Sequence, residues 1–73
     1  MKEITLTVER DEESQMLVAS WDDPKGGGIT TQGKDLSQLQ VSVREAVACH
    51  FDKGKAPSRI RLHFINDPVL AGA

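Results

Sequence analysis

DLSQLQVSVREAVACHF, residues 35–51, is the segment of the sequence in which apolar residues recur at intervals of three and four. That spacing places them on one face of an α-helix and leaves polar residues on the other face. Asp35, with Gln38 three residues later, matches a capping box, in which two side chains satisfy free backbone N–H groups at the start of a helix. The sequence predicts an amphipathic helix with a buried stripe made of Leu36, Leu39, Val43, Ala46, Val47 and His50.

The residues after this segment predict where the helix ends. Lys53 and Lys55 suit the negative end of a helix, and Gly54 is a candidate for the left-handed C′ position that follows many helices. Pro57 cannot continue a helix, because its backbone nitrogen carries no hydrogen. We therefore expect the last helical turn just before Gly54.

The segments on either side of the helix alternate with a period of two, which is typical of β-strands with one buried face. KEITLTVER and MLVASW, at residues 2–10 and 16–21, are separated by a polar turn short enough for an antiparallel hairpin. ITTQG at 29–33 forms a short third strand, and SRIRLHFI at 58–65 forms the last one. The predicted fold is α+β: one domain, residues 1–73, with an antiparallel sheet, β-β-β-α-β order and the helix packed on one sheet face.

A single helix can cover only one face of this sheet. The alternation predicts that the covered face carries Ile4, Leu6, Val8, Ile60, Leu62 and Phe64. The second strand has apolar residues on both sides, so its buried set is either Leu17, Ala19 and Trp21 or Met16, Val18 and Ser20. The opposite sheet face is either solvated or covered by another chain.

Exposed apolar side chains on the uncovered face would mark an interface, and Val18 and Ile65 are expected there. Domains of this size are also often reinforced by a partner chain. We therefore expect a homodimer or a higher oligomer. The predicted partner-binding residues are Val18, Arg59, Arg61, His63 and Ile65.

The glycine-rich stretch at residues 21–35 comes close to a phosphate-binding loop. Gly28, Gly33 and Lys34 have the spacing of the G-x-x-x-x-G-K-[ST] motif. However, Asp35 stands where the motif has a hydroxyl, and the ITTQ between the glycines favours a strand. An acidic residue at the start of the helix would also repel an anion there. We interpret this stretch as a turn followed by a strand.

No set of residues in the sequence predicts a catalytic, cofactor or metal site. Cys49 and His50 are neighbours on the helix and point about 100° apart, which makes a poor nucleophile–base pair. We expect His50 to be hydrogen-bonded at the edge of the core and Cys49 to be a small packing residue. One cysteine and two histidines do not supply a zinc site. The protein is not expected to be an enzyme; a general-base role would require a pocket that holds His50 or His63 beside an acid or a nucleophile.

Composition narrows the class of partner and the compartment. The 73 residues carry a net charge of −2, which gives no general attraction to nucleic acid or to an anionic membrane. No apolar run approaches the ~20 residues that span a bilayer. A single cysteine and the lack of a signal peptide lead us to expect a cytoplasmic protein.

The segments ITLTVERDE, LVASW and DDPKGGGITTQGKDLSQLQVSVREAV together resemble the N-terminal domain of the HicB antitoxin family. The resemblance covers about residues 2–66, and the last strand SRIRLHF completes it. The positions that carry the family's Pro-Gly segment, its T-x-G strand end and its helix start are Pro24, Gly28, Thr31, Gly33, Asp35, Leu36 and Ala46.

This resemblance implies a partial double-stranded-RNA-binding-like fold and an antitoxin role. Antitoxins of this family mask a small ribonuclease toxin, and a C-terminal domain binds operator DNA. Only eight residues follow Ile65 here, too few for such a domain. The expected function is therefore a protein-interaction module that masks a small toxin protein, without its own DNA-binding domain.

An RNA-associated domain is the alternative. Lys53, Lys55, Arg59 and Arg61 cluster near the helix end and the last strand, where they could contact phosphates. The net negative charge and the three aromatic residues argue against a nucleic-acid surface, because such surfaces are basic and often stack bases on aromatic rings. Nucleic acid is thus not the expected partner.

Overall fold

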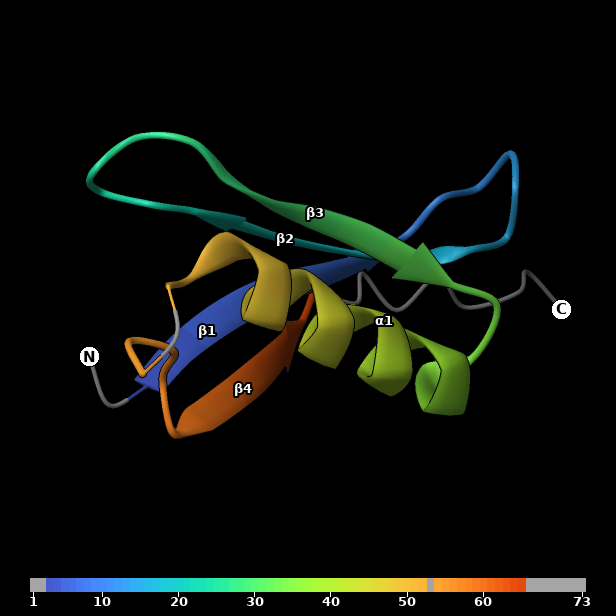
Figure 1. Ribbon diagram of the computed structural model, residues 1–73. Helices are drawn as coiled ribbons and strands as arrows, with labels where there is room; N and C mark the ends of the chain where they lie inside the picture. The colour runs from blue at the N-terminus through green and yellow to red at the C-terminus, as the bar shows by residue number, and fades with distance from the viewer. Residues whose placement is uncertain (1–2, 53, 66–73) are drawn as a thin grey trace, which may run out of the picture.

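The computed structural model describes residues 3–52 and 54–65 (Figure 1). Its elements, in chain order, are β1 (Glu3–Arg10), β2 (Leu17–Asp22), β3 (Gly28–Gly33), α1 (Leu36–His50) and β4 (Arg59–Phe64). The strands form one sheet in the order β3-β2-β1-β4, and α1 lies across one face of it. The predicted α+β class and the β-β-β-α-β order are confirmed.

The sheet is mixed rather than wholly antiparallel. β1 pairs antiparallel with β2, and β2 pairs antiparallel with β3. β4 pairs with β1 in parallel, from Glu3 opposite Arg59 to Val8 opposite Phe64. The reason is the helix: α1 carries the chain back along the sheet, so β4 runs in the same direction as β3 and therefore as β1. A helical crossover is the usual connection between parallel strands.

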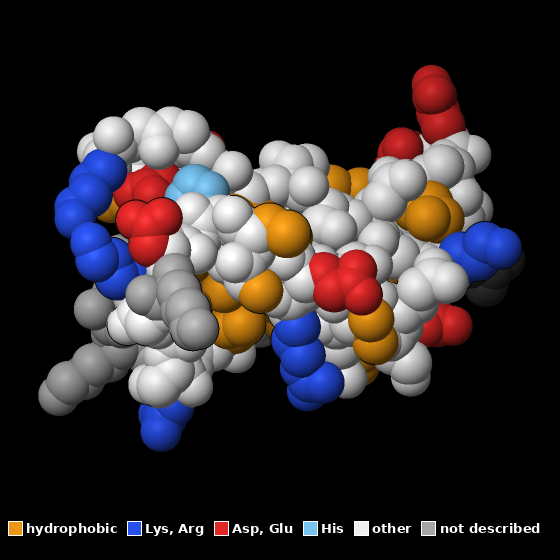
Figure 2. Space-filling view, viewed as in Figure 1, with side chains coloured by type: hydrophobic (Ala, Val, Ile, Leu, Met, Phe, Trp, Pro, Cys, Tyr) orange, Lys and Arg blue, Asp and Glu red, His pale blue; other side chains and the backbone are white. Residues whose placement is uncertain are grey.

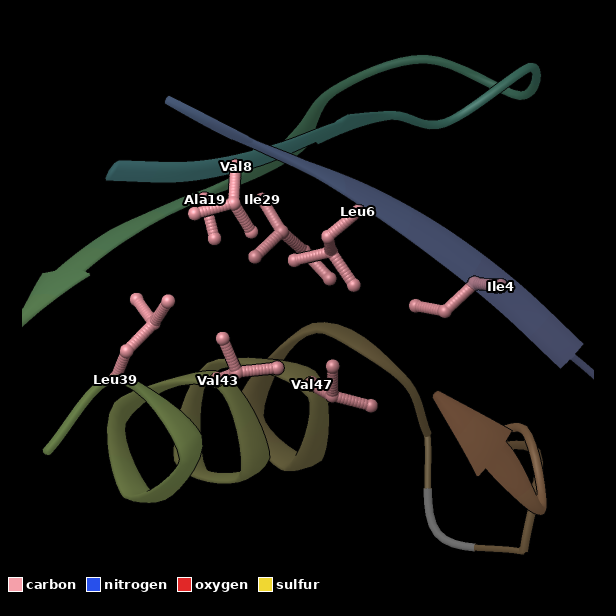
Figure 3. Close-up of a cluster of buried hydrophobic side chains, with 8 residues drawn as sticks. All are labelled: Ile4, Leu6, Val8, Ala19, Ile29, Leu39, Val43 and Val47. Atoms are coloured by element: carbon pink, nitrogen blue, oxygen red, sulfur yellow. The ribbon is translucent and has the colours of Figure 1, made fainter. Parts of the chain in front are cut away.

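The core lies between α1 and the inner part of the sheet (Figure 3). Figure 3 shows the buried side chains of the helix pointing toward those of the strands. Leu6 and Leu39 are fully buried, from the centre of β1 and the first half of α1 respectively. The complete set of buried hydrophobic residues is Ile4, Leu6, Val8, Ala19, Ile29, Leu39, Val43 and Val47.

The second strand, whose buried side the sequence left open, buries the side that carries Ala19. Ala19 is fully buried, and Leu17 and Trp21 pack against the core from the same side of β2. Val18 and Ser20 therefore point to the opposite sheet face, because side chains alternate along a strand.

The predicted helical stripe is buried in its middle and exposed at its start. Leu39, Val43 and Val47 are buried, whereas Leu36 is 45% exposed. Leu36 is the first residue of α1, whereas the buried residues lie further along the helix. Phe64, at the end of β4, is 38% exposed, although it lies on the covered face as predicted.

The start of α1 is capped as the sequence predicts. The Asp35 carboxylate accepts a hydrogen bond from the Gln38 backbone N–H at 2.8 Å. The Gln38 side chain reaches back and accepts from the backbone N–H of Lys34 at 2.7 Å. These two bonds fix the direction in which the chain enters the helix.

The end of α1 differs from the prediction. The helix ends at His50, and Phe51 has an extended backbone, so Gly54 is not the C′ residue. Instead, Gly54 has φ +82° within a turn closed by a hydrogen bond from Lys55 N–H to the Asp52 carbonyl. The ring of Phe51, the first residue after the helix, packs beside those of Trp21 and His50.

Gly33, at the end of β3, sets how closely α1 approaches the sheet. A Cβ atom at this position would lie 2.5 Å from the backbone nitrogen of Leu39 and 2.8 Å from its Cα. Both atoms belong to the helix backbone, so no side-chain rotation could relieve the overlap. The first turns of the helix can pack on β3 only because residue 33 has no side chain.

We predict that Gly33→Ala lowers the free energy of unfolding by about 1–3 kcal/mol, the usual cost of forcing extra volume into a packed site. Denaturant unfolding followed by circular dichroism measures this change. Gln32→Ala, an exposed neighbour on the same strand, is the matched control and should change stability by less than about 0.5 kcal/mol. Equal stability of the Gly33→Ala variant and the wild type would contradict this packing role.

Candidate functional site

The connection between β2 and β3 holds Asp23 in a fixed position. Its backbone N–H donates to the Gly27 carbonyl at 3.1 Å, and its carbonyl accepts from the Gly26 N–H at 2.9 Å. Its side-chain Oδ1 accepts from the Lys25 backbone N–H at 2.9 Å. Gly26 and Gly27 have φ of +110° and +72°, a region that glycine adopts without strain. The glycine-rich stretch is thus a turn, as predicted, and it orients a carboxylate.

That carboxylate contacts the last residue of α1. The Asp23 Oδ2 lies 2.8 Å from Nε2 of His50, whose side chain is 21% exposed. Trp21 and Phe51 enclose the imidazole, with ring centroids 5.7 and 4.9 Å from it in edge-to-face geometry. His50 is therefore a hydrogen-bonded histidine at the edge of the core, as expected. The contact joins the end of the helix to the β2–β3 turn.

The pKa of Asp23 is lowered from its usual value. The hydrogen bond from His50 is the largest cause, and the backbone N–H of Lys25 adds to it; partial burial works in the opposite direction. Asp23 is therefore a carboxylate at neutral pH, and His50 Nε2 carries the proton that the carboxylate accepts. The contact with Asp23 fixes the orientation of the imidazole.

A surface hollow of about 520 Å³ lies beside this pair. It places a histidine next to an acid, which is the arrangement that a general-base hypothesis requires. Its described lining offers no serine, threonine or cysteine as a nucleophile. Cys49, expected to be a small packing residue, is exposed. It lies about 200° around the helix from the buried Val47, and therefore on a different side of α1. The lining consists of Asp23, Lys25, His50, Phe51, Asp52, Gly54, Lys55 and Ala56.

Residues 3–52 and 54–65 contain neither a metal-binding cluster nor a membrane-spanning helix. Within these ranges, no three side chains of His, Cys, Asp or Glu gather so that they could hold a metal ion. The helix found in the same ranges is neither long enough nor apolar enough to cross a membrane.

The second candidate surface is the sheet face opposite α1, here called the open face, which no described element covers. It contains the predicted partner-binding residues. Arg59, Arg61 and His63 form an exposed row along β4, and Ile65 follows them at 46% exposed. Val18 lies two strands away on β2 and is half-buried.

The open face is polar, not apolar. Glu9 lies opposite Val18 on β1, and by the register of β1 and β4 it also lies opposite Ile65. The expected patch of Val18 and Ile65 is therefore interrupted by a carboxylate. Hydroxyl and amide groups occupy the rest of the face, from Thr5, Thr7, Ser20, Thr30 and Gln32.

Among the described residues, two of the basic residues that the sequence grouped together have acidic neighbours. Arg61 contacts Glu3 at 3.5 Å, in an ion pair whose side chains are both well exposed. Lys55 lines the hollow that also contains Asp23 and Asp52. Lys53 lies outside the described residues. Acidic neighbours thus offset two of the cations on which an RNA contact would depend.

An acidic turn forms one end of the molecule, where β1 connects to β2 (Figure 2). Asp11 organises it: its carboxylate accepts from the Glu13 backbone N–H at 3.2 Å and from the Ser14 hydroxyl at 3.0 Å. Glu12 and Glu13 are exposed at the tip, and Glu9 lies at the adjoining corner of the open face. The described residues therefore define a small α+β domain with a polar open face and an acidic end.

Comparison with known proteins yields one relative. No family model matches the chain, and no solved structure matches it. A UPF0150 protein of Thermotoga maritima is similar, with 40% identity over 43 residues. The match spans 59% of this chain and 60% of that protein, so it reaches less than two thirds of the relative's length. The relative's name states no activity, ligand or partner.

We predict that Asp23→Asn lowers the melting temperature at neutral pH. Because folding lowers the pKa of Asp23, its contribution to stability is present above about pH 4 and is lost as the pH falls through the lowered value. The melting temperatures of variant and wild type should therefore converge in acid. Thermal unfolding from about pH 7 down to about pH 3 measures this, with the exposed neighbour change Asp22→Asn as control. A difference that stays constant over this range would show that the ionised carboxylate is not the stabilising group.

Proposed function

We propose that this protein is an antitoxin-like interaction module that masks a small ribonuclease toxin. Three features support the proposal: the resemblance of residues 2–66 to the HicB antitoxin domain, the β-β-β-α-β fold, and the similarity to a UPF0150 protein. The single observation that carries it is the open face, a whole sheet surface that no described element covers.

The polarity of the open face suits a partner that binds reversibly. Interfaces between proteins that also exist apart are about as polar as the rest of the surface, whereas permanent dimers bury more apolar area. Val18 and Ile65 would provide two separate apolar contacts, one on each side of Glu9. Hydroxyl groups in the neighbouring row Thr7, Ser20 and Thr30 would supply hydrogen bonds beside these contacts.

The acidic end of the molecule supports the choice of partner. A ribonuclease must bind a polyanion, so its substrate surface is basic. Glu9, Asp11, Glu12 and Glu13 present negative charge beside the open face and would attract such a surface over several ångströms. Masking would then combine steric cover by the sheet with competition for the cations that hold RNA.

Self-association and cellular location complete the proposal. A 73-residue chain has a small core, so pairing as a homodimer or a higher oligomer would add buried area. We place its action in the cytoplasm, because its single cysteine is a free, exposed thiol, and such thiols persist in reducing compartments.

RNA association is the second candidate, favoured by the row of Arg59, Arg61 and His63 on the open face. Binding to duplex RNA that weakens with salt and is lost in the variant with both Arg59→Ala and Arg61→Ala would support it over masking. The ion pair between Arg61 and Glu3 argues against it.

We predict that the full chain inhibits the ribonuclease activity of a small basic protein encoded beside it. Ser20→Arg, in the middle of the open face, should weaken inhibition at least about tenfold, because a bulky cation would face a basic partner. Glu12→Lys combined with Glu13→Lys should slow association about tenfold. Ribonuclease assays and surface binding kinetics measure both effects.

Glu45→Lys is the matched control, since Glu45 is exposed on α1 and so lies on the other side of the sheet. It should leave inhibition unchanged. Full ribonuclease activity at saturating amounts of this protein would defeat the proposal. Light scattering tests self-association separately, and a monomer at high concentration would remove that part alone.

A further inference from the structure

β4 has a free edge. It is the outer strand of the sheet, and among the described residues no strand lies beyond it. The Ile65 N–H donates to the Val8 carbonyl at 2.9 Å, on the β1 side. Because backbone groups alternate sides along a strand, the N–H and C=O groups of Ile60, Leu62 and Phe64 point away from β1. These groups form a template on which another strand can pair.

A groove with both apolar and polar lining residues runs beside this edge. It has a volume of about 220 Å³ and lies between α1 and β4. Figure 2 shows hydrophobic side chains reaching the surface between the helix and this strand. Ile60 and Leu62 are only half-buried, since α1 packs mainly on β3 and β2. The groove is lined by Gln40, Val43, Arg44, Ile60 and Leu62.

The groove and the free edge belong to the same residues. Ile60 and Leu62 direct their side chains into the groove and their backbone groups to the edge. A strand added at this edge would therefore place every second side chain over the groove, beside α1. Apolar side chains there would pack on Val43, Ile60 and Leu62, and their neighbours along the added strand would lie on the open face.

The charges on the open face determine which residues of an added strand can lie there, between those that face the groove. Arg59, Arg61 and His63 point there from β4. If a second copy paired through its own β4, these side chains would face one another, and like charges directly opposite are destabilising. β1, which already pairs with β4, shows the kind of strand that suits it. Ile4, Leu6 and Val8 of β1 lie on the covered face, and Glu3 contacts Arg61 at 3.5 Å.

We propose that the free edge of β4 binds an extended protein segment in which acidic and apolar residues alternate. The segment pairs with β4 through its backbone, its apolar side chains fill the groove against α1, and its carboxylates meet Arg59 and Arg61. This mode is strand addition, in which the backbone supplies affinity and alternate side chains supply specificity. The inference goes beyond toxin masking and does not depend on it.

Hydrogen exchange of the full chain, followed by NMR, tests the proposal. The probe is the acetylated and amidated peptide Thr-Val-Glu-Ile-Glu-Val-Thr. We expect the amides of Ile60, Leu62 and Phe64 to exchange freely without the peptide and at least about tenfold more slowly with it. The amides of Arg61 and His63 point toward β1 and should change little.

Reversing the charges of the peptide and of β4 provides the control. The matched peptide with Lys in place of Glu should bind about tenfold more weakly, and Arg59→Glu combined with Arg61→Glu should reverse this preference. Lys34→Glu, a charge reversal at an exposed position outside β4, should leave the preference unchanged. Unchanged amide patterns from Leu6 and Leu39 would show that each variant is folded.

Three results would overturn the proposal. Amides of Ile60 and Leu62 that are already protected in the free protein would show that this chain or a second copy occupies the edge. Equal binding of the two peptides would remove the role of Arg59 and Arg61. If the variant with Arg59→Glu and Arg61→Glu is folded and still prefers the peptide with Glu, that result would also remove the role of Arg59 and Arg61.

Discussion

The width of one helix limits how much of this sheet can be covered. A helix is about 10 Å wide, whereas four strands spaced about 4.8 Å apart form a sheet about 19 Å wide. The backbone of α1 lies closest to β3, and side chains of β1, β2 and β3 are buried beneath it, whereas Ile60 and Leu62 of β4 are only half-buried. The groove beside β4 follows from this mismatch.

Contacts at both ends of β3 hold the helix along that strand. At one end, Gly33 lets the backbone of Leu39 approach, and the capping box of Asp35 and Gln38 sets the direction of entry. At the other end, Asp23 in the turn before β3 binds His50, the last residue of α1. The hydrogen-bonded pair thus acts first on structure: it fixes the helix along β3, and the groove stays open as a consequence.

The parts of the fold that depend on local pattern could be predicted from the sequence. The period-two alternation of apolar residues predicted the strands and the covered face. Their spacing by three and four, with the capping box, predicted the helix and its start. The parallel pairing of β1 with β4 could not be predicted in this way, because it depends on where the crossover returns the chain.

The contact between Asp23 and His50 joins distant positions, which is why the sequence did not predict it. Asp23 and His50 are 27 residues apart, and nothing in the spacing of either indicates the other. The available signal for this contact was a histidine at the end of the apolar stripe, together with a glycine-rich turn that contains aspartate. The open face was expected, but its polarity required the register that places Glu9 between Val18 and Ile65. Its proposed partners remain predictions.

The pairing of the first strand with the last has a consequence for how the chain is made. β1 is central in the sheet, yet its parallel neighbour β4 is the last in chain order of the strands that the structure describes. Long-range pairs of this kind raise contact order and slow folding. During synthesis the nascent chain therefore exposes one side of β1, with the backbone groups of Ile4, Leu6 and Val8, until β4 is free to pair with it.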